Sequence, residues 1–248
     1  MNVHVVMPAF NEAEGIGEFL LELNTALQPW NPTFTVVDDC SLDNTSDVVM
    51  ETAATGVSVS VVRNSINSGH GPSTIRALSA GVASGVPIIL AIDGDGQFVA
   101  SDVRRVLEVL ADAAGTDIVE GVRSNRDDPW FRKAVSFGTR VLVWSRAGQL
   151  PADANTPLRA YRRAALEQLL GAIPENAMTP NLLVSVMSRR GAFTLTQVQV
   201  RSRPRRGASD VGTTWGRGGR LLPSSRFVAF CWNAGKQWIA MPRSGTSR

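Results

Sequence analysis

A length of 248 residues suffices for one large domain, or for one domain with an appendage, and a hydrophobic share of 44% excludes an intrinsically disordered chain. Two cysteines, Cys40 and Cys231, exclude a disulfide framework and favour a reducing compartment. No basic segment precedes the first strand-like run, and no apolar stretch approaches the roughly 20 residues that cross a bilayer. We therefore expect neither a signal peptide nor a transmembrane helix.

The formal net charge of +3 is unevenly distributed along the chain. Residues 1–200 contain 15 basic and 21 acidic side chains, whereas residues 201–248 contain 10 basic side chains and one acidic side chain, Asp210. A basic end on an acidic body favours an anionic partner, such as a phosphorylated substrate, lipid headgroups or nucleic acid.

Strand-like and helix-like runs alternate in the first half of the chain. Asn11 is placed to cap the first of the helices. Helices of this length between strands predict βαβ crossovers, and therefore a mainly parallel sheet with helices on both faces. The predicted strands are residues 3–7, 33–37, 57–63, 86–92 and 117–122, and the predicted helices are residues 16–27, 46–54, 72–84 and 101–110.

The second half of the chain is less regular. Residues 193–200 alternate apolar and polar side chains, as an edge or antiparallel strand does. An arginine-rich stretch follows at residues 201–206, and a helix-like run closes the chain at residues 226–241. Further helices are predicted at residues 128–146, 163–170 and 180–189, and a further strand at residues 158–161.

Polar clusters follow the first four predicted strands, at the point where each strand ends. Because ligands of open parallel sheets bind outside the carboxyl ends of the strands, we expect these four loops to converge on one site. The clusters are Pro8–Glu12, Asp38–Asn44, Asn64–Gly71 and Asp93–Gln97.

The last of these loops, Asp93-Gly94-Asp95-Gly96-Gln97, directly follows an apolar run. Two carboxylates one residue apart suit a hard divalent cation, which in the case of magnesium rests on one or two carboxylates and on substrate phosphates. Gln97 adds a neutral oxygen or an amide donor. A simple Asp-Gly turn is the alternative for a lone motif of this kind. Its position among four convergent loops favours a metal site of Asp93, Asp95 and Gln97.

Together these motifs resemble inverting, family-2-type glycosyltransferases with the GT-A fold, and most of all the dolichol-phosphate mannose synthase-like branch, which acts on polyprenyl phosphates. The resemblance covers about residues 3–206. It implies an α/β GT-A (Rossmann-like) domain at residues 1–206, with a nucleotide-sugar half at about 1–122 and an acceptor half at about 123–206. Residues 207–248 would form a basic, aromatic C-terminal segment. The motifs that carry it are residues 6–12 (VMPAFNE), 37–45 (VDDCSLDNT), 67–71 (NSGHG) and 93–97 (DGDGQ).

The resemblance also implies roles for individual residues. Asp39, with Asp38 beside it, would accept a hydrogen bond from a ring N–H of guanine or uracil, so the donor is a GDP- or UDP-linked sugar. Asp93, Asp95 and Gln97 would hold Mg²⁺ or Mn²⁺ across the diphosphate, and Asp153 matches an acidic position of the family. The remaining nucleotide-sugar contacts would come from Pro8, Phe10, Asn11, Glu12, Asn67, Gly69, His70, Asp93 and Gly94.

The acceptor is predicted from the charges of the second half. Family-2 enzymes that act on hydroxyls carry an acidic pair near the start of a helix here, whereas residues 175–181 (ENAMTPN) contain only Glu175. A phosphate acceptor is already an anion and needs cations rather than a base. This favours a polyprenyl phosphate over a protein or glycan hydroxyl, for which Asp153 or Glu175 would serve as base. The candidate phosphate-binding residues are Arg123, Arg126, Arg132, Arg203, Arg205 and Arg206.

The C-terminal run at residues 226–241 can place Phe227, Phe230, Trp238 and Met241 on one helical face, with cations around them. Such a helix lies in the plane of a membrane, or it packs on this domain or on a second subunit of a homo-oligomer. The first case predicts a cytoplasmic protein that is peripheral at the cytoplasmic membrane face. A non-enzymatic alternative is a nucleic-acid-binding module that uses the basic C-terminus. It is disfavoured because the acidic body carries the convergent loops.

Overall fold

The computed structural model describes the backbone of residues 1–124, 130–206 and 225–240, and the side chains of residues 1–124, 133–206 and 232–239. The first half contains β1 (Val3–Ala9), α1 (Ile16–Ala26), η1 (Gln28–Trp30), β2 (Thr33–Asp38), α2 (Thr45–Ala54), β3 (Val59–Arg63), α3 (His70–Ala83), β4 (Ile88–Ala91), α4 (Ala100–Asp112) and β5 (Ile118–Ser124). The second half contains α5 (Trp130–Ala147), β6 (Arg159–Arg162), α6 (Arg163–Leu170), α7 (Pro180–Arg190), β7 (Leu195–Arg201) and α8 (Ser225–Ala240).

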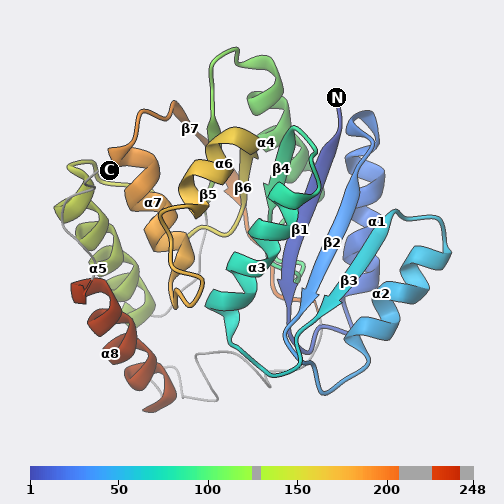
Figure 1. Ribbon diagram of the computed structural model, residues 1–248, viewed down its shortest axis with the longest axis horizontal. Helices are drawn as coiled ribbons and strands as arrows, with labels where there is room; N and C mark the ends of the chain where they lie inside the picture. The colour runs from blue at the N-terminus through green and yellow to red at the C-terminus, as the bar shows by residue number, and fades with distance from the viewer. Residues whose placement is uncertain (125–129, 207–224, 241–248) are drawn as a thin grey trace.

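Seven strands form one sheet in the order β3-β2-β1-β4-β6-β5-β7 (Figure 1). Six strands run parallel, and β6 alone is antiparallel to both of its neighbours, β4 and β5. The predicted mainly parallel sheet is confirmed. The strand expected at residues 193–200 is indeed an edge strand, but β7 pairs parallel with β5. Helices α6 and α7 return the chain to the edge of the sheet where β6 ends and β5 begins, so β7 starts at the same edge as β5.

Helices cover both faces of the sheet, and each face has its own hydrophobic core. Helices α1, α2 and α4 lie on one face, and α3, α6 and α7 lie on the other, with α5 and α8 as an outer layer beside α7 (Figure 1). The central strands are apolar on both sides because successive side chains point to opposite faces. In β4, for example, Ile88 and Leu90 enter the first core, and Ile89 and Ala91 enter the second.

Helix α8 packs on this domain, which was one of the alternatives for the C-terminal run. Trp238 is 8% exposed, its ring lies under the guanidinium of Arg146 in α5, and its carbonyl accepts a hydrogen bond from the same side chain. The side chain of Gln237 donates to the carbonyl of Asn176 and accepts from the backbone N–H of Met178. Trp238 therefore does not belong to an exposed face, which the membrane alternative required of it. The side chains of Phe227 and Phe230, and Met241, lie outside the described residues.

No helix among the described residues is long and apolar enough to cross a membrane.

Candidate functional site

The loops after β1, β2, β3 and β4 lie together at the carboxyl edge of the sheet, as expected for parallel strands. Backbone hydrogen bonds join them directly. The N–H of Asp39 donates to the carbonyl of Ala9 at 2.9 Å, and the N–H of Gly94 donates to the carbonyl of Pro8 at 3.2 Å. The nucleotide-binding and metal-binding candidates of the sequence are therefore neighbours in the fold.

The loop after β1 is held in a specific shape by the loop after β2. Asn11 has a φ of 54°, is 5% exposed, and accepts a hydrogen bond from the N–H of Leu42 on its Oδ1 at 2.8 Å. Asn11 does not cap α1, which begins at Ile16 after the N-cap residue Gly15. Pro8 and Phe10 are partly exposed at this edge, where a ligand can reach them.

The carboxylate of Asp39 organises the loop after β3. It accepts hydrogen bonds from Asn64 Nδ2 at 2.7 Å and from the backbone N–H groups of Ser68 and Gly69, both at 2.8 Å, and it is 3% exposed. Three donors therefore hold its two oxygens. Asp39 fixes the start of α3, where His70 and Gly69 lie, and its contact with a nucleotide base stays a prediction.

Asp38 has a structural position. Its side chain is completely buried, it accepts hydrogen bonds from the N–H of Ser41 at 2.9 Å and from the hydroxyl of Ser46, and Arg63 lies 3.7 Å away. The carboxylate has no exposed surface in this structure, and the predicted nucleotide contact of Asp38 stays a prediction. The side chain closes the turn between β2 and α2.

The loop of residues 93–97 brings two carboxylates together. The N–H of Gln97 donates to Asp95 Oδ1 at 3.0 Å, and Gly96 has a φ of 67°, which favours glycine. Burial and the neighbouring charge of Asp93 raise the pKa of Asp95 to about 6. His70 Nε2 lies 3.8 Å from a carboxylate oxygen of Asp93.

This donor set fits a hard divalent cation that is shared with a ligand. Asp93 and Asp95 repel each other, and a cation between them removes that repulsion. Within the part of the chain that the structure describes, no three His, Cys, Asp or Glu side chains gather as a metal site. A cation held by Asp93 and Asp95 would take further ligands from elsewhere, and phosphate oxygens are suited to that role.

Residues 201–206, here called the arginine segment, lie across residues 93–97, here called the metal loop because they include the predicted metal ligands. The N–H of Arg203 donates to the carbonyl of Gln97 at 2.8 Å, and the N–H of Arg206 donates to the carbonyl of Asp95 at 3.0 Å. The guanidinium of Arg203 also donates to the carbonyl of Gly96 at 2.7 Å. These bonds attach the end of β7 to the loop that follows β4.

Three arginines of this segment are paired with carboxylates of α1 and of the loop before it, while Arg201 binds Asp102 of α4. Arg203 and Arg206 both bind Glu22, and Arg205 binds Glu12 through two hydrogen bonds. Burial raises the pKa of the Glu12 carboxyl to about 7, although Arg205 opposes the shift. The sequence correctly suggested arginines near the site, but in this structure their charges are engaged by carboxylates.

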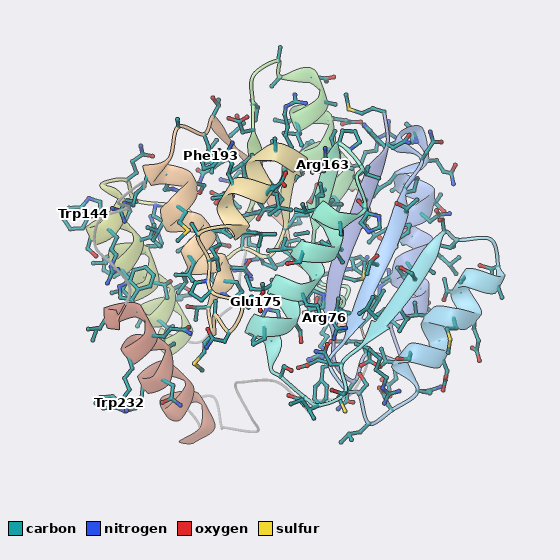
Figure 2. The ribbon with its side chains drawn as sticks, viewed as in Figure 1. Arg76, Trp144, Arg163, Glu175, Phe193 and Trp232 are labelled. Carbon is teal, nitrogen blue, oxygen red and sulfur yellow. The ribbon has the colours of Figure 1, made fainter. Side chains whose placement is uncertain are left out.

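Arg123 and Asp153, predicted as phosphate-binding and catalytic residues, bind each other. Arg123 donates from Nε and Nη2 to the two oxygens of Asp153, at 2.7 and 3.1 Å. This bidentate pair joins the end of β5 to the loop that precedes β6. Glu175 is exposed in the loop between α6 and α7 (Figure 2). The side chain of Arg132 and residue Arg126 lie outside the described residues, as does Asp210.

A buried ionic network went unrecognised in the sequence. Arg159 in β6 and Glu120 in β5 are both completely buried and their side chains approach to 3.1 Å, while Arg189 in α7 binds the other oxygen of Glu120 at 2.6 Å. Arg159 also donates to Asn181 Oδ1 at 3.2 Å and to Ser185 Oγ at 2.7 Å. Opposite charges inside two predicted apolar strands were the available signal. No sequence pattern indicated that Asn181 belongs to this network.

A small hollow lies beside Asp93. It is lined by Pro8 of β1, Asp93 of the loop after β4, Thr74 of α3, Pro157 of the segment before β6, and Asn181 of α7. The hollow therefore adjoins the metal loop and both halves of the predicted domain.

Comparisons with known proteins identify the family of this chain. Residues 4–170 match Glycosyl transferase family 2. The undecaprenyl-phosphate 4-deoxy-4-formamido-L-arabinose transferase of Serratia proteamaculans is 31% identical in an alignment of 193 residues that covers 76% of this chain and 57% of that relative. The chain thus spans little more than half the length of this curated relative.

Solved structures share the fold at low sequence identity. Glucosyl-3-phosphoglycerate synthase from Mycobacterium tuberculosis, crystallised with Mn²⁺ and uridine-diphosphate-glucose, has a TM-score of 0.65 at 19% identity, covering 98% of this chain and 81% of that chain. Mannosyl-3-phosphoglycerate synthase from Rubrobacter xylanophilus has a TM-score of 0.65 at 17% identity, covering 97% and 73%. The architecture is a GT-A glycosyltransferase fold, and the chain belongs to Glycosyl transferase family 2.

Proposed function

We propose that this protein is a metal-dependent, inverting glycosyltransferase that moves a hexose from a GDP- or UDP-linked sugar to a polyprenyl-phosphate-type acceptor. The carboxylate pair of Asp93 and Asp95 at the end of β4 carries the proposal, because it adjoins the loop of Pro8 and the hollow between the two halves. The polyprenyl-phosphate relative supports the choice of acceptor.

Asp93 and Asp95, with Gln97, would hold Mg²⁺ or Mn²⁺. When bound, the cation neutralises charge on the departing diphosphate. The partly exposed ring of Phe10 and the start of α3, held by Asp39, are placed to bind the nucleotide and its phosphates. An acceptor phosphate attacks as an anion, so the chain need not supply a base.

A transfer screen with Mn²⁺ tests the proposal. Wild-type protein should release nucleoside diphosphate from a GDP- or UDP-linked sugar and place the sugar on a prenyl phosphate with inverted anomeric configuration. Asp95→Asn should lower the rate by at least about a hundredfold, the magnitude expected for a lost charge-stabilising group. Asp112→Asn, at the exposed end of α4, is the charge-matched control and should keep the wild-type rate.

Equal rates for Asp95→Asn and wild type would refute the metal site. Sugar found on a protein or glycan hydroxyl rather than in the lipid phase would replace the acceptor class. Strong salt-sensitive DNA binding without nucleotide-sugar turnover would replace the enzyme with the nucleic-acid-binding alternative.

A lipid acceptor also requires contact with a membrane, and we propose that the outer face of α5 and α8 makes it. Trp144 and Trp232 project outward from these helices (Figure 2). The exposed fractions are 53% for Trp144, 68% for Trp232, 60% for Phe137 and 79% for Ile239. Lys236 lies over the ring of Trp232. Aromatic side chains with cations beside them are typical of a membrane interface.

Sedimentation with anionic phospholipid vesicles tests this contact. A double variant, Trp144→Ser and Trp232→Ser, should bind vesicles several-fold more weakly than wild type, because it removes two large apolar side chains. The control variant, Leu21→Ser and Met50→Ser, removes exposed apolar side chains of α1 and α2 at the opposite end of the molecule (Figure 1). Equal loss in both double variants would contradict the assignment of this face.

A further inference from the structure

The start of α7 lies at the hollow beside Asp93. Asn181 is the second residue of this 11-residue helix, is 7% exposed, and lines the hollow together with Asp93 and Pro157. A buried polar side chain at this place needs a partner, because an unpaired buried donor is costly.

One backbone N–H group in the first turn of α7 has no acceptor among the described residues. Pro180 has no N–H, and the N–H groups of Leu182 and Leu183 both donate to the carbonyl of Thr179, at 3.1 and 3.2 Å. No side chain caps the helix. The N–H of Asn181 has no partner among the described residues, and it lies at the positive end of the helix dipole.

The buried Arg159 determines which way the Asn181 amide faces. A guanidinium only donates, so the atom 3.2 Å from Arg159 Nη1 is the oxygen Oδ1, and the Nδ2 group points away from Arg159. Nδ2 has no partner in the described part of the chain. The guanidinium of Arg159 is fixed in this orientation because it also binds Glu120 and Ser185. The amide is therefore preset with its donor free.

We infer that Asn181, through its backbone N–H and its Nδ2, binds a phosphate oxygen of the acceptor next to the metal loop. Unpaired donors at a helix N-terminus suit an anionic oxygen. A carboxamide cannot remove a proton from a hydroxyl, so it suits an acceptor that is already ionised. Asn181 is then a specificity-determining residue, and the inference rests on the proposed function.

Asn181→Asp tests the site with little change of shape. The new carboxylate still accepts the bond from Arg159, but it removes the Nδ2 donor and repels an anion. Asn176→Asp is the matched control, because it adds the same charge five residues earlier at an exposed position. Asn181→Ala, a second variant, removes the donor without adding charge. Thermal unfolding confirms that each variant is folded.

The measurements are calorimetric binding of a soluble ten-carbon prenyl phosphate, in the presence of Mn²⁺ and nucleoside diphosphate, and the KM of each substrate in transfer. Asn181→Asp should weaken acceptor binding at least about tenfold, the effect of one lost hydrogen bond to a charged group. Asn181→Ala should weaken it several-fold. Asn176→Asp should stay within about twofold of wild type, and the KM for the donor sugar should not change.

An unchanged acceptor affinity in Asn181→Asp would overturn the inference, and so would an effect confined to the donor sugar. The proposed function is refuted independently of Asn181 if the wild-type protein transfers sugar to no prenyl phosphate. In that case, titration with inorganic phosphate still tests whether Asn181 binds phosphate. Binding that is weakened in Asn181→Asp supports it, whereas no binding, or equal binding by both proteins, overturns it.

Discussion

Gly71 makes a backbone contact whose removal should destabilise the protein. It lies in the first turn of α3, in the NSGHG motif. A Cβ atom at this position would lie 2.2 Å from the carbonyl oxygen of Ala177 and 2.7 Å from that of Met178. Both carbonyls belong to the loop before α7, so the glycine lets two parts of the backbone approach each other.

The size of the effect follows from two opposing contributions. Alanine in a helix is favoured over glycine by about 1 kcal/mol. Overpacking costs about 1–3 kcal/mol, and the cost lies at the upper end or beyond when backbone atoms must move. We expect Gly71→Ala to lose about 2 kcal/mol, a fall in melting temperature of roughly 4–8 °C for a chain of this size.

Gly138 provides the matched control. It is also a helical glycine, in α5, and a Cβ atom there would meet nothing within 4 Å. Gly138→Ala should raise stability by about 0.5–1 kcal/mol. Urea denaturation and differential scanning calorimetry of the two variants measure the difference. A Gly71→Ala protein as stable as wild type would refute the reasoning, because the loop before α7 would then yield without cost.

Three further predictions concern charge. Glu120→Ala leaves Arg159 and Arg189 buried without their carboxylate and should cost about 3–5 kcal/mol in urea denaturation, whereas a loss below about 1 kcal/mol would contradict the burial of the network. Burial raises the pKa of Glu12 to about 7, so its contribution to stability is fully present below pH 4.5 and is lost as the pH rises through 7. In metal-free buffer, Glu12→Gln should flatten this loss of stability with rising pH, which is about 3 kcal/mol at most. An unchanged pH profile of stability would exclude Glu12 as its cause. Mn²⁺ with a nucleoside diphosphate should raise the melting temperature of wild type but not of Asp95→Asn, and equal shifts would place the metal elsewhere.

Local patterns were sufficient to predict most of the sheet. Val103, Val106, Leu107 and Leu110 share one face by spacing alone, and all four are buried in α4. The parallel strands followed from the helices between them. The direction of β7 did not, because its alternating pattern describes burial on one side and carries no information about the direction of its neighbour.

The candidate site was predictable in position but not in its contacts. Motifs after strands placed Asp93 and Asp95 correctly at the carboxyl edge. The pairing of Arg205 with Glu12, however, joins residues 193 positions apart, and no local pattern encodes such a contact. Asp38 and Asp39 are adjacent in the chain yet differ in role, because consecutive side chains at a strand end point to opposite sides.

The reversed direction of β6 has a consequence for how specificity can vary. In a parallel strand the chain reaches the functional edge as the strand ends, but in β6 it leaves that edge as the strand begins. Pro157, which lines the hollow, and Asp153, which binds Arg123, therefore lie in the segment that precedes β6 rather than in a loop that follows a strand. Insertions or exchanges at residues 150–157 would reshape the surroundings of the hollow while leaving the register of the parallel strands β3, β2, β1 and β4 untouched. The fold thus allows this side of the candidate site to change independently of the loops that follow those strands.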